Sequence, residues 1–115
     1  MPRMLMTVAE LPEYLRAAGK LWTDVDRQAV VDHLAAPPKA GLLIEGTGGV
    51  RKLRWARDGR GKSGGMRVIS YFHSEAMPLY LLTMFAKNER ANLSRAERNE
   101  LGGLVNELVR LWFER

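Results

Sequence analysis

The stretch VRKLRWARDGRGKSGGMR, residues 50–67, concentrates side chains of the kind that bind phosphate. From Arg51 to Arg67 it holds seven basic residues and one acidic residue, whereas the remainder of the chain holds 11 basic and 12 acidic residues. The seven cations are Arg51, Lys52, Arg54, Arg57, Arg60, Lys62 and Arg67. Because like charges repel one another and cost stability, a local excess of this kind indicates an anionic partner.

Alternation along RKLRW predicts the direction of two of these cations. If Leu53 and Trp55 face the core of a sheet, Lys52 and Arg54 must emerge on the opposite face, because successive side chains of a strand point to opposite sides. Arg51 and Arg57 then share the side of the core, at its margins. Lys52 and Arg54 would thus form a ridge on one sheet face.

The side of the sheet taken by Arg67 is left open. In MRVISYF, residues 66–72, the set that contains Val68 and the set that contains Arg67 fit the core side equally well.

A further cation, Lys87, follows the last apolar run. An open sheet face that carries Lys and Arg suits a phosphate backbone. The rings that would add stacking, if their parity allows, are Tyr71, Tyr80 and Phe85.

The octapeptide ARDGRGKS, residues 56–63, nearly matches the phosphate-binding loop G-x-x-x-x-G-K-[ST], with alanine in place of the first glycine. That loop functions between a buried strand and a helix whose N-terminal amides hold the phosphates. Here the preceding RKLRW is half charged, and the following GGMRVISYF is β-branched and aromatic. The segment therefore fits a hairpin loop better than a nucleotide site.

Composition restricts the class of protein. With 115 residues, 46% of them apolar, the chain fits one globular domain over 1–115. The absence of cysteine excludes a disulfide framework, a thiolate nucleophile and a sulfur metal site, which suits a reducing compartment. His33 and His73 lack the spacing of a metal site. No apolar run approaches the roughly 18 residues needed to cross a bilayer, and no signal-peptide layout is visible, so we expect a cytoplasmic protein.

Capping residues and apolar spacing predict the order of the elements. We expect a short strand at 4–8, helices over about 12–19 and 24–36, strands within 41–46, 50–56, 66–72 and 79–85, and a helix from about 95 onward. Thr23 can cap the second helix, and Ser94 with Glu97 forms a capping box for the last. This order predicts an α+β domain with an antiparallel sheet whose helices cover one face and leave the other partly open.

Three blocks at set intervals resemble the RelE/HigB superfamily of type II toxins, closest to its HigB-like branch. They are GTGGVRKLRW, GKSGGMR and AKNE-x-x-N-L-S, and the resemblance covers about residues 37–108. It implies a single RelE-like domain in which N-terminal helices and a C-terminal helix pack on a small antiparallel sheet. It also implies a ribosome-dependent endoribonuclease that needs no metal or other cofactor and cuts mRNA by attack of a 2′-hydroxyl on the adjacent phosphate, leaving a cyclic phosphate.

The partners implied by the resemblance are a helix-turn-helix antitoxin, the ribosome and mRNA. Operator DNA would be bound only through the complex with the antitoxin, and no membrane is involved. By matching position, the expected catalytic residues are Lys52, Arg54, Arg67 and Lys87, and the expected RNA-binding residues are Arg51, Arg57, Arg60, Lys62 and Tyr71. Asn88 stands where relatives carry another arginine, and no tyrosine occurs near Leu93, so the general acid is unassigned.

The chemistry of the residues agrees with these roles. Attack by a 2′-hydroxyl needs a base, cations that hold the charge developing on the phosphoryl oxygens, and a donor for the departing 5′ oxygen. Without a suitable histidine pair, a lysine has to act as the base, and neighbouring cations around Lys52 disfavour its charged form. Arginine stays protonated, but its planar fork suits the phosphate.

Two other functions remain open from the sequence. The first is a nuclease-inactive module that uses the same cationic face only to bind RNA or the antitoxin, because a fold does not guarantee chemistry. The second is a member of the ParE-like branch, whose members poison DNA gyrase. The basic set in RKLRW favours the nuclease, since the gyrase poisons generally lack it.

Overall fold

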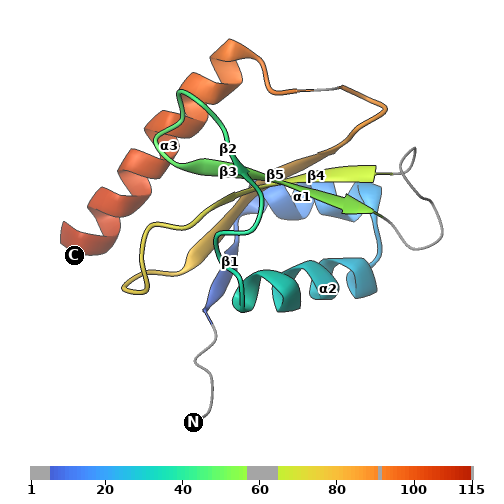
Figure 1. Cartoon of the computed structure of the whole chain (residues 1–115), viewed down its shortest axis with the longest axis horizontal. Helices are drawn as coiled ribbons and strands as arrows, with labels where there is room; N and C mark the ends of the chain where they lie inside the picture. Colours follow the sequence, from blue (N-terminus) through green and yellow to red (C-terminus); the bar gives the residue numbers. More distant parts are fainter. Residues whose placement is uncertain (1–5, 57–64, 91, 115) are drawn as a thin grey trace, which may run out of the picture.

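The computed structural model describes residues 6–56, 65–90 and 92–114 of the chain. Its elements in chain order are β1 (Val8–Glu10), α1 (Pro12–Leu21), α2 (Asp24–Ala35), β2 (Leu42–Leu43), β3 (Val50–Ala56), β4 (Gly65–Tyr71), β5 (Leu79–Ala86) and α3 (Arg95–Glu114). The α+β class predicted from the sequence is confirmed (Figure 1). None of the described helices is long and apolar enough to cross a membrane.

The five described strands form one sheet in the order β1-β5-β4-β3-β2. The neighbours β2 to β5 pair antiparallel, as expected. The outer strand β1 pairs parallel to β5, with Val8 opposite Leu79, so the sheet is mixed rather than purely antiparallel. The crossover that a parallel pair requires is supplied by all the elements between β1 and β5.

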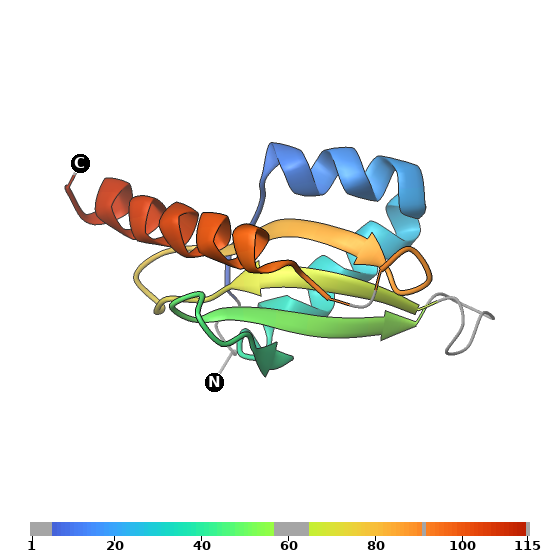
Figure 2. The same cartoon turned by 90° about the horizontal axis from the view of Figure 1, so that it is seen from above.

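The helices pack on both faces of the sheet, which corrects the expectation that they share one face. α1 and α2 pack on the side that carries Met66 and Val68 of β4, and α3 packs on the side that carries Ile69 and Tyr71. Figure 2 shows α3 over the part of the sheet where β3 and β5 begin, and α3 does not reach the part where these strands end. β4 is buried along its whole length because it is covered on both sides.

The helix boundaries follow from their capping residues. Thr23 Oγ1 accepts the N–H of Asp26 at 3.2 Å, which completes a capping box at the start of α2. At α3, Ser94 Oγ accepts the N–H of Glu97 at 3.1 Å, and Glu97 Oε1 accepts the N–H of Ser94 at 2.9 Å. Both caps predicted from the sequence are thus confirmed. The second fixes where the chain leaves the sheet to begin α3.

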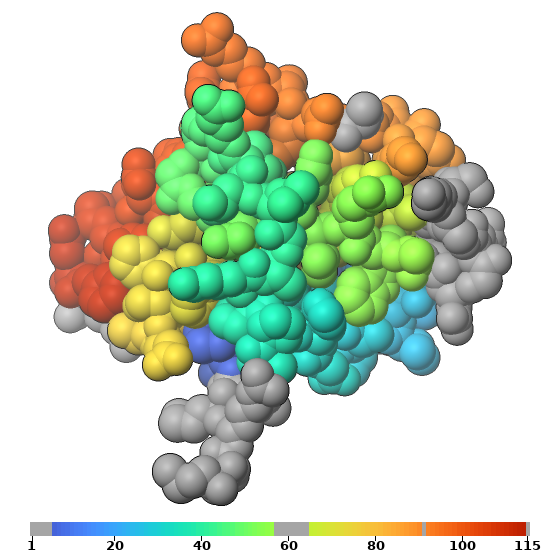
Figure 3. Space-filling model, viewed as in Figure 1, coloured from blue at the N-terminus to red at the C-terminus, as the bar shows by residue number. Residues whose placement is uncertain are grey.

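Gly41 sets the approach of β2 to β3. Its φ of +98° lies in the region that favours glycine, and a Cβ added there would come within 2.7 Å of the carbonyl oxygen of Lys52. The turn that follows β2 is closed by Thr47, whose hydroxyl donates to the carbonyl of Ile44 at 2.6 Å and accepts the N–H of Val50 at 3.1 Å. These contacts hold the edge of the sheet beside Lys52, and this edge faces the viewer in Figure 3.

Candidate functional site

A depression on the α3 side of the sheet gathers the cations that the sequence singled out. It has a volume of about 640 Å³ and is lined by Gly41, Leu42, Lys52, Leu53, Arg54, Arg67 and Lys87. The four predicted catalytic residues therefore lie around one hollow, although they come from β3, β4 and the turn after β5. Among the residues lining it there is no acidic side chain.

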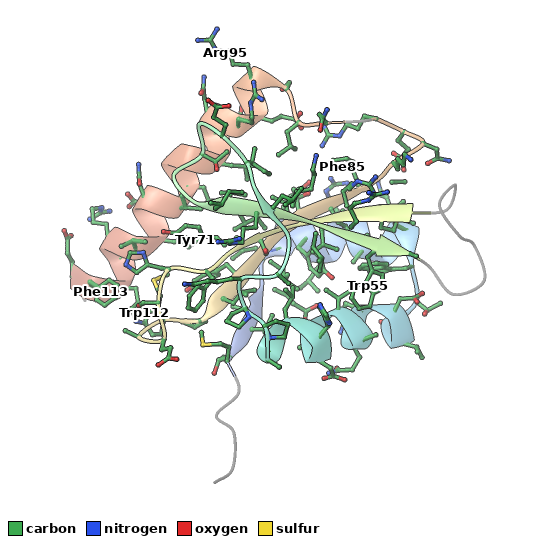
Figure 4. All side chains as sticks on the ribbon, viewed as in Figure 1. Trp55, Tyr71, Phe85, Arg95, Trp112 and Phe113 are labelled. Atoms are coloured by element: carbon green, nitrogen blue, oxygen red, sulfur yellow. The ribbon has the colours of Figure 1, made fainter. Side chains whose placement is uncertain are left out.

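Strand register explains why these cations meet. Arg54 of β3 lies directly opposite Arg67 of β4, and Lys52 lies opposite Ile69 two positions along. Leu53 and Trp55 pack with the core under α1 and α2, so Lys52 and Arg54 point to the other side, as alternation predicted. Figure 4 shows Trp55 on the side of α2 and Phe85 on the opposite side of the sheet.

Packing resolves the side taken by Arg67, which the sequence left open. Ile69, two residues along β4, belongs to the core under α3, so Arg67 shares that face. The opposite set, with Met66 and Val68, packs under α1 and α2. Arg67 therefore lies on the same sheet face as Arg54, directly opposite it in the pairing of β3 with β4.

Arg67 is a buried cation, with only 8% of its surface exposed. Its guanidinium Nη1 donates to the carbonyl oxygen of the neighbouring Met66 at 3.2 Å. No carboxylate among the described residues forms a salt bridge with Arg67. Burial lowers the pKa of Arg67, and the positive charge of Arg54 lowers that pKa further. A buried arginine facing another arginine is costly in a free protein and becomes favourable when an anion binds between them.

Lys52 is held by a residue that sequence reasoning missed. Its Nζ donates to Oδ1 of Asn92 at 2.8 Å, across 40 positions of sequence. Asn92 lies in the segment between β5 and α3, two residues before the Ser94 cap. The only sequence signal for this residue was its place in the AKNE-x-x-N-L-S block. The contact places the amine at the boundary between the depression and the start of α3.

A second cation, Arg90, stands beside this face and was also missed. Its guanidinium carbon lies 4.6 Å from the centroid of the Phe85 ring, and Phe85 is opposite Arg67 in the pairing of β5 with β4. Its Nη1 donates to Glu97 Oε2 at 2.5 Å. Hydrogen bonds from Arg90 and Ser94 lower the pKa of Glu97, so the carboxylate is charged and neutralises Arg90. Arg90 therefore forms a salt bridge with Glu97, whereas no described carboxylate forms a salt bridge with Arg67.

Two of the predicted RNA-binding residues lie away from the depression. Arg51 is on the opposite sheet face from Lys52, and its Nη1 donates to the carbonyls of Lys39 at 3.1 Å and Gly41 at 3.2 Å. Tyr71 is at the far end of β4 from Arg67, 6% exposed, with its hydroxyl 3.1 Å from Nδ1 of His73. Burial also raises the pKa of Tyr71. Arg51 thus braces the β2 edge, and Tyr71 is a core residue under the C-terminal half of α3 (Figure 4).

Several other predicted features can be placed. Arg57, Arg60 and Lys62, and most of the near match to a phosphate-binding loop, lie outside the described residues. Trp55 packs edge-on against His33, with 5.5 Å between ring centroids, so it belongs to the α2 side and does not reach the cations. Within the described ranges, no cluster of three or more His, Asp or Glu side chains is arranged to hold a metal ion.

The site thus combines the Lys52 amine, held by a hydrogen bond from Nζ to Asn92, with two arginines that lie opposite each other and with Lys87 at the rim. This set can grip a phosphodiester and can offer both an amine and guanidinium donors to it. A family model described as the RelE toxin of the RelE/RelB toxin-antitoxin system matches residues 39–113. The match spans β2 to α3 and includes all four cations of the depression.

Proposed function

Because this chain belongs to the RelE toxin family and is the toxin component of a toxin-antitoxin system, we propose that it is a ribosome-dependent endoribonuclease that cuts mRNA during translation. The observation that carries the proposal is the depression in which Lys52, Arg54, Arg67 and Lys87 converge, with no acidic side chain among the described residues that line it. A site of this composition favours a phosphodiester over a neutral or cationic ligand.

The proposed reaction is an attack within the RNA strand. Lys52 removes the proton from a ribose 2′-hydroxyl, and the freed oxygen forms a bond to the adjacent phosphorus. The bond from phosphorus to the 5′ oxygen of the next nucleotide breaks, and that oxygen takes up a proton. The products are a 2′,3′-cyclic phosphate and a free 5′-hydroxyl. No oxidant, reductant or further reactant is required.

Each cation has a proposed role in this step. Arg54 and Arg67 face each other across β3 and β4, so a phosphoryl group between them would meet donors from two sides as negative charge develops on its oxygens. Lys87 is exposed at the end of β5, where it is free to approach the departing 5′ oxygen as proton donor. The guanidiniums cannot serve as the base because arginine stays protonated at neutral pH.

The partners follow from the family and from the charge of the site. The family places the chain with an antitoxin. We propose that this antitoxin is a helix-turn-helix protein, that the two together bind operator DNA, and that the toxin acts on ribosomes in the cytoplasm. The three sequence blocks that resemble the HigB-like branch support an assignment to that branch.

Induced expression of the wild-type chain in a bacterial host should arrest growth and fragment translated mRNA. The double variant Lys52→Ala, Arg67→Ala should do neither, because it lacks both the proposed base and the central phosphate ligand. Mapping of mRNA ends before and after induction measures the cleavage, and circular dichroism of the purified variant checks that it is folded.

Other outcomes of the same experiment would replace the proposal. Growth arrest with intact messages and broken DNA would identify a gyrase poison of the ParE-like kind. An absence of arrest, with the wild-type protein folded and abundant, would indicate a module that binds RNA or antitoxin without cutting.

A further inference from the structure

Among the described side chains, Asn92 forms a hydrogen bond with Lys52 alone. Its Oδ1 accepts from Lys52 Nζ at 2.8 Å. A lysine side chain has four rotatable bonds, and fixing it costs conformational entropy. A single acceptor at a defined place therefore favours those rotamers of Lys52 that bring Nζ to it. The hydrogen bond selects one position of Nζ at the edge of the depression.

The segment that carries Asn92 is itself anchored on both sides of the contact. Leu93, the next residue, is buried in the core under α3. Ser94 and Glu97 form the reciprocal cap of α3. Glu97 also binds Arg90, whose guanidinium stacks over Phe85 in the sheet. The start of α3 is thus tied to β5, the strand that pairs with Arg67 of β4, and the backbone at Asn92 is held in place beside Lys52.

The chemistry of the acceptor matters as much as its place. A carboxylate at this position would favour the charged form of a neighbouring lysine, which is the wrong form for a base. The amide oxygen of asparagine accepts one N–H of the amine without supplying a counter-charge. An amine held in this way by one hydrogen bond keeps its other directions free, and the open direction is the depression lined by Arg54, Arg67 and Lys87.

We infer that Asn92 is a positioning residue that orients the Lys52 amine toward the phosphodiester through their hydrogen bond. The inference rests on the proposed function, because the amine is worth orienting only if it takes part in the reaction. Asn92 does not touch the substrate in this account; it acts through Lys52. Its contribution should therefore vanish when the lysine is removed.

A double-mutant cycle tests this inference. In single-turnover cleavage on programmed ribosomes, Asn92→Ala should lower the rate of the chemical step about tenfold and change the half-saturating toxin concentration by less than about twofold. In the Lys52→Ala background the same substitution should have no further effect. Asn106→Ala, which removes an exposed asparagine from α3, serves as the matched control and should behave like wild type.

A spectroscopic measurement tests the contact independently of activity. The Nζ–H signal of Lys52, assigned by its loss in Lys52→Ala, should persist in wild type at low temperature and should broaden in Asn92→Ala, because the hydrogen bond slows proton exchange. Asn92→Asp keeps an acceptor oxygen at the same place and should retain the signal. Equal effects of Asn92→Ala with and without Lys52, or an unchanged Nζ–H signal, would overturn the inference. If the wild-type protein keeps the signal but cuts no message, the proposed function fails instead.

Discussion

Lys52→Ala is expected to lower the rate of mRNA cleavage by roughly 10²–10⁴-fold, the range that general acid-base catalysis usually contributes. The amine lies at the edge of the cationic depression and is held by Asn92, so its removal takes away the proposed base and, when the amine is protonated, one positive charge. Cleavage of a defined message on purified ribosomes measures the rate. Lys20→Ala, which removes an exposed lysine from the last turn of α1, should retain the wild-type rate.

Lys52→Arg separates the two contributions of this side chain. Arginine keeps the positive charge but stays protonated, so it cannot remove a proton from the 2′-hydroxyl. If Lys52 is the base, Lys52→Arg should be nearly as inactive as Lys52→Ala. A Lys52→Arg protein that cuts within about tenfold of wild type would mean that the lysine only holds the phosphate, and the base would have to be sought elsewhere.

Arg67→Met is expected to lower the rate of cleavage strongly and to make the folded protein more stable. Loss of a donor that holds developing charge usually costs about 10²–10³-fold in rate. The free energy of unfolding should rise by about 1 kcal/mol, because a buried guanidinium that faces Arg54 is replaced by an apolar chain of similar length. Cleavage assays and urea unfolding measure the two effects. Opposite changes in activity and stability are the signature of a residue kept for function.

Arg51→Met is the matched control for the stability measurement. Arg51 is on the neighbouring strand but donates to the carbonyls of Lys39 and Gly41, so its loss should lower the free energy of unfolding by about 1–2 kcal/mol. The two substitutions are chemically identical and should change stability in opposite directions. If Arg67→Met destabilises as much as Arg51→Met, Arg67 is a structural residue and its proposed role as phosphate ligand is wrong.

The sequence predicted those parts of the site that depend on local pattern. Alternation in β3 correctly separated Lys52 and Arg54 from Leu53 and Trp55, because one face of that strand meets an apolar core. The capping box at Ser94 correctly marked the start of α3. The clustering of seven cations in a single stretch was visible from the sequence alone.

The parts that depended on distant contacts could not be predicted. β4 is buried on both faces, so its residues carry no alternation that would assign Arg67 to one side. The amphipathic pattern of α3 identifies its apolar stripe but not which face of the sheet that stripe covers. The Lys52–Asn92 hydrogen bond joins a strand to a segment 40 positions away, and a single polar residue in a loop gives no periodic signal. β1 has three residues, too few for a sequence pattern that would predict a parallel pairing.

The most direct test of the proposed reaction uses a message with one hydroxyl removed. Once the cleavage site has been mapped, the nucleotide whose 2′-hydroxyl would attack is replaced by its 2′-deoxy form, and the altered message is translated on ribosomes with the wild-type toxin. We predict that cleavage at that site disappears, whereas a message with the 2′-deoxy nucleotide one position away is cut and ends in a 2′,3′-cyclic phosphate. Cleavage of the altered message at the normal rate would contradict attack by the 2′-hydroxyl and the roles proposed for Lys52, Arg54 and Arg67.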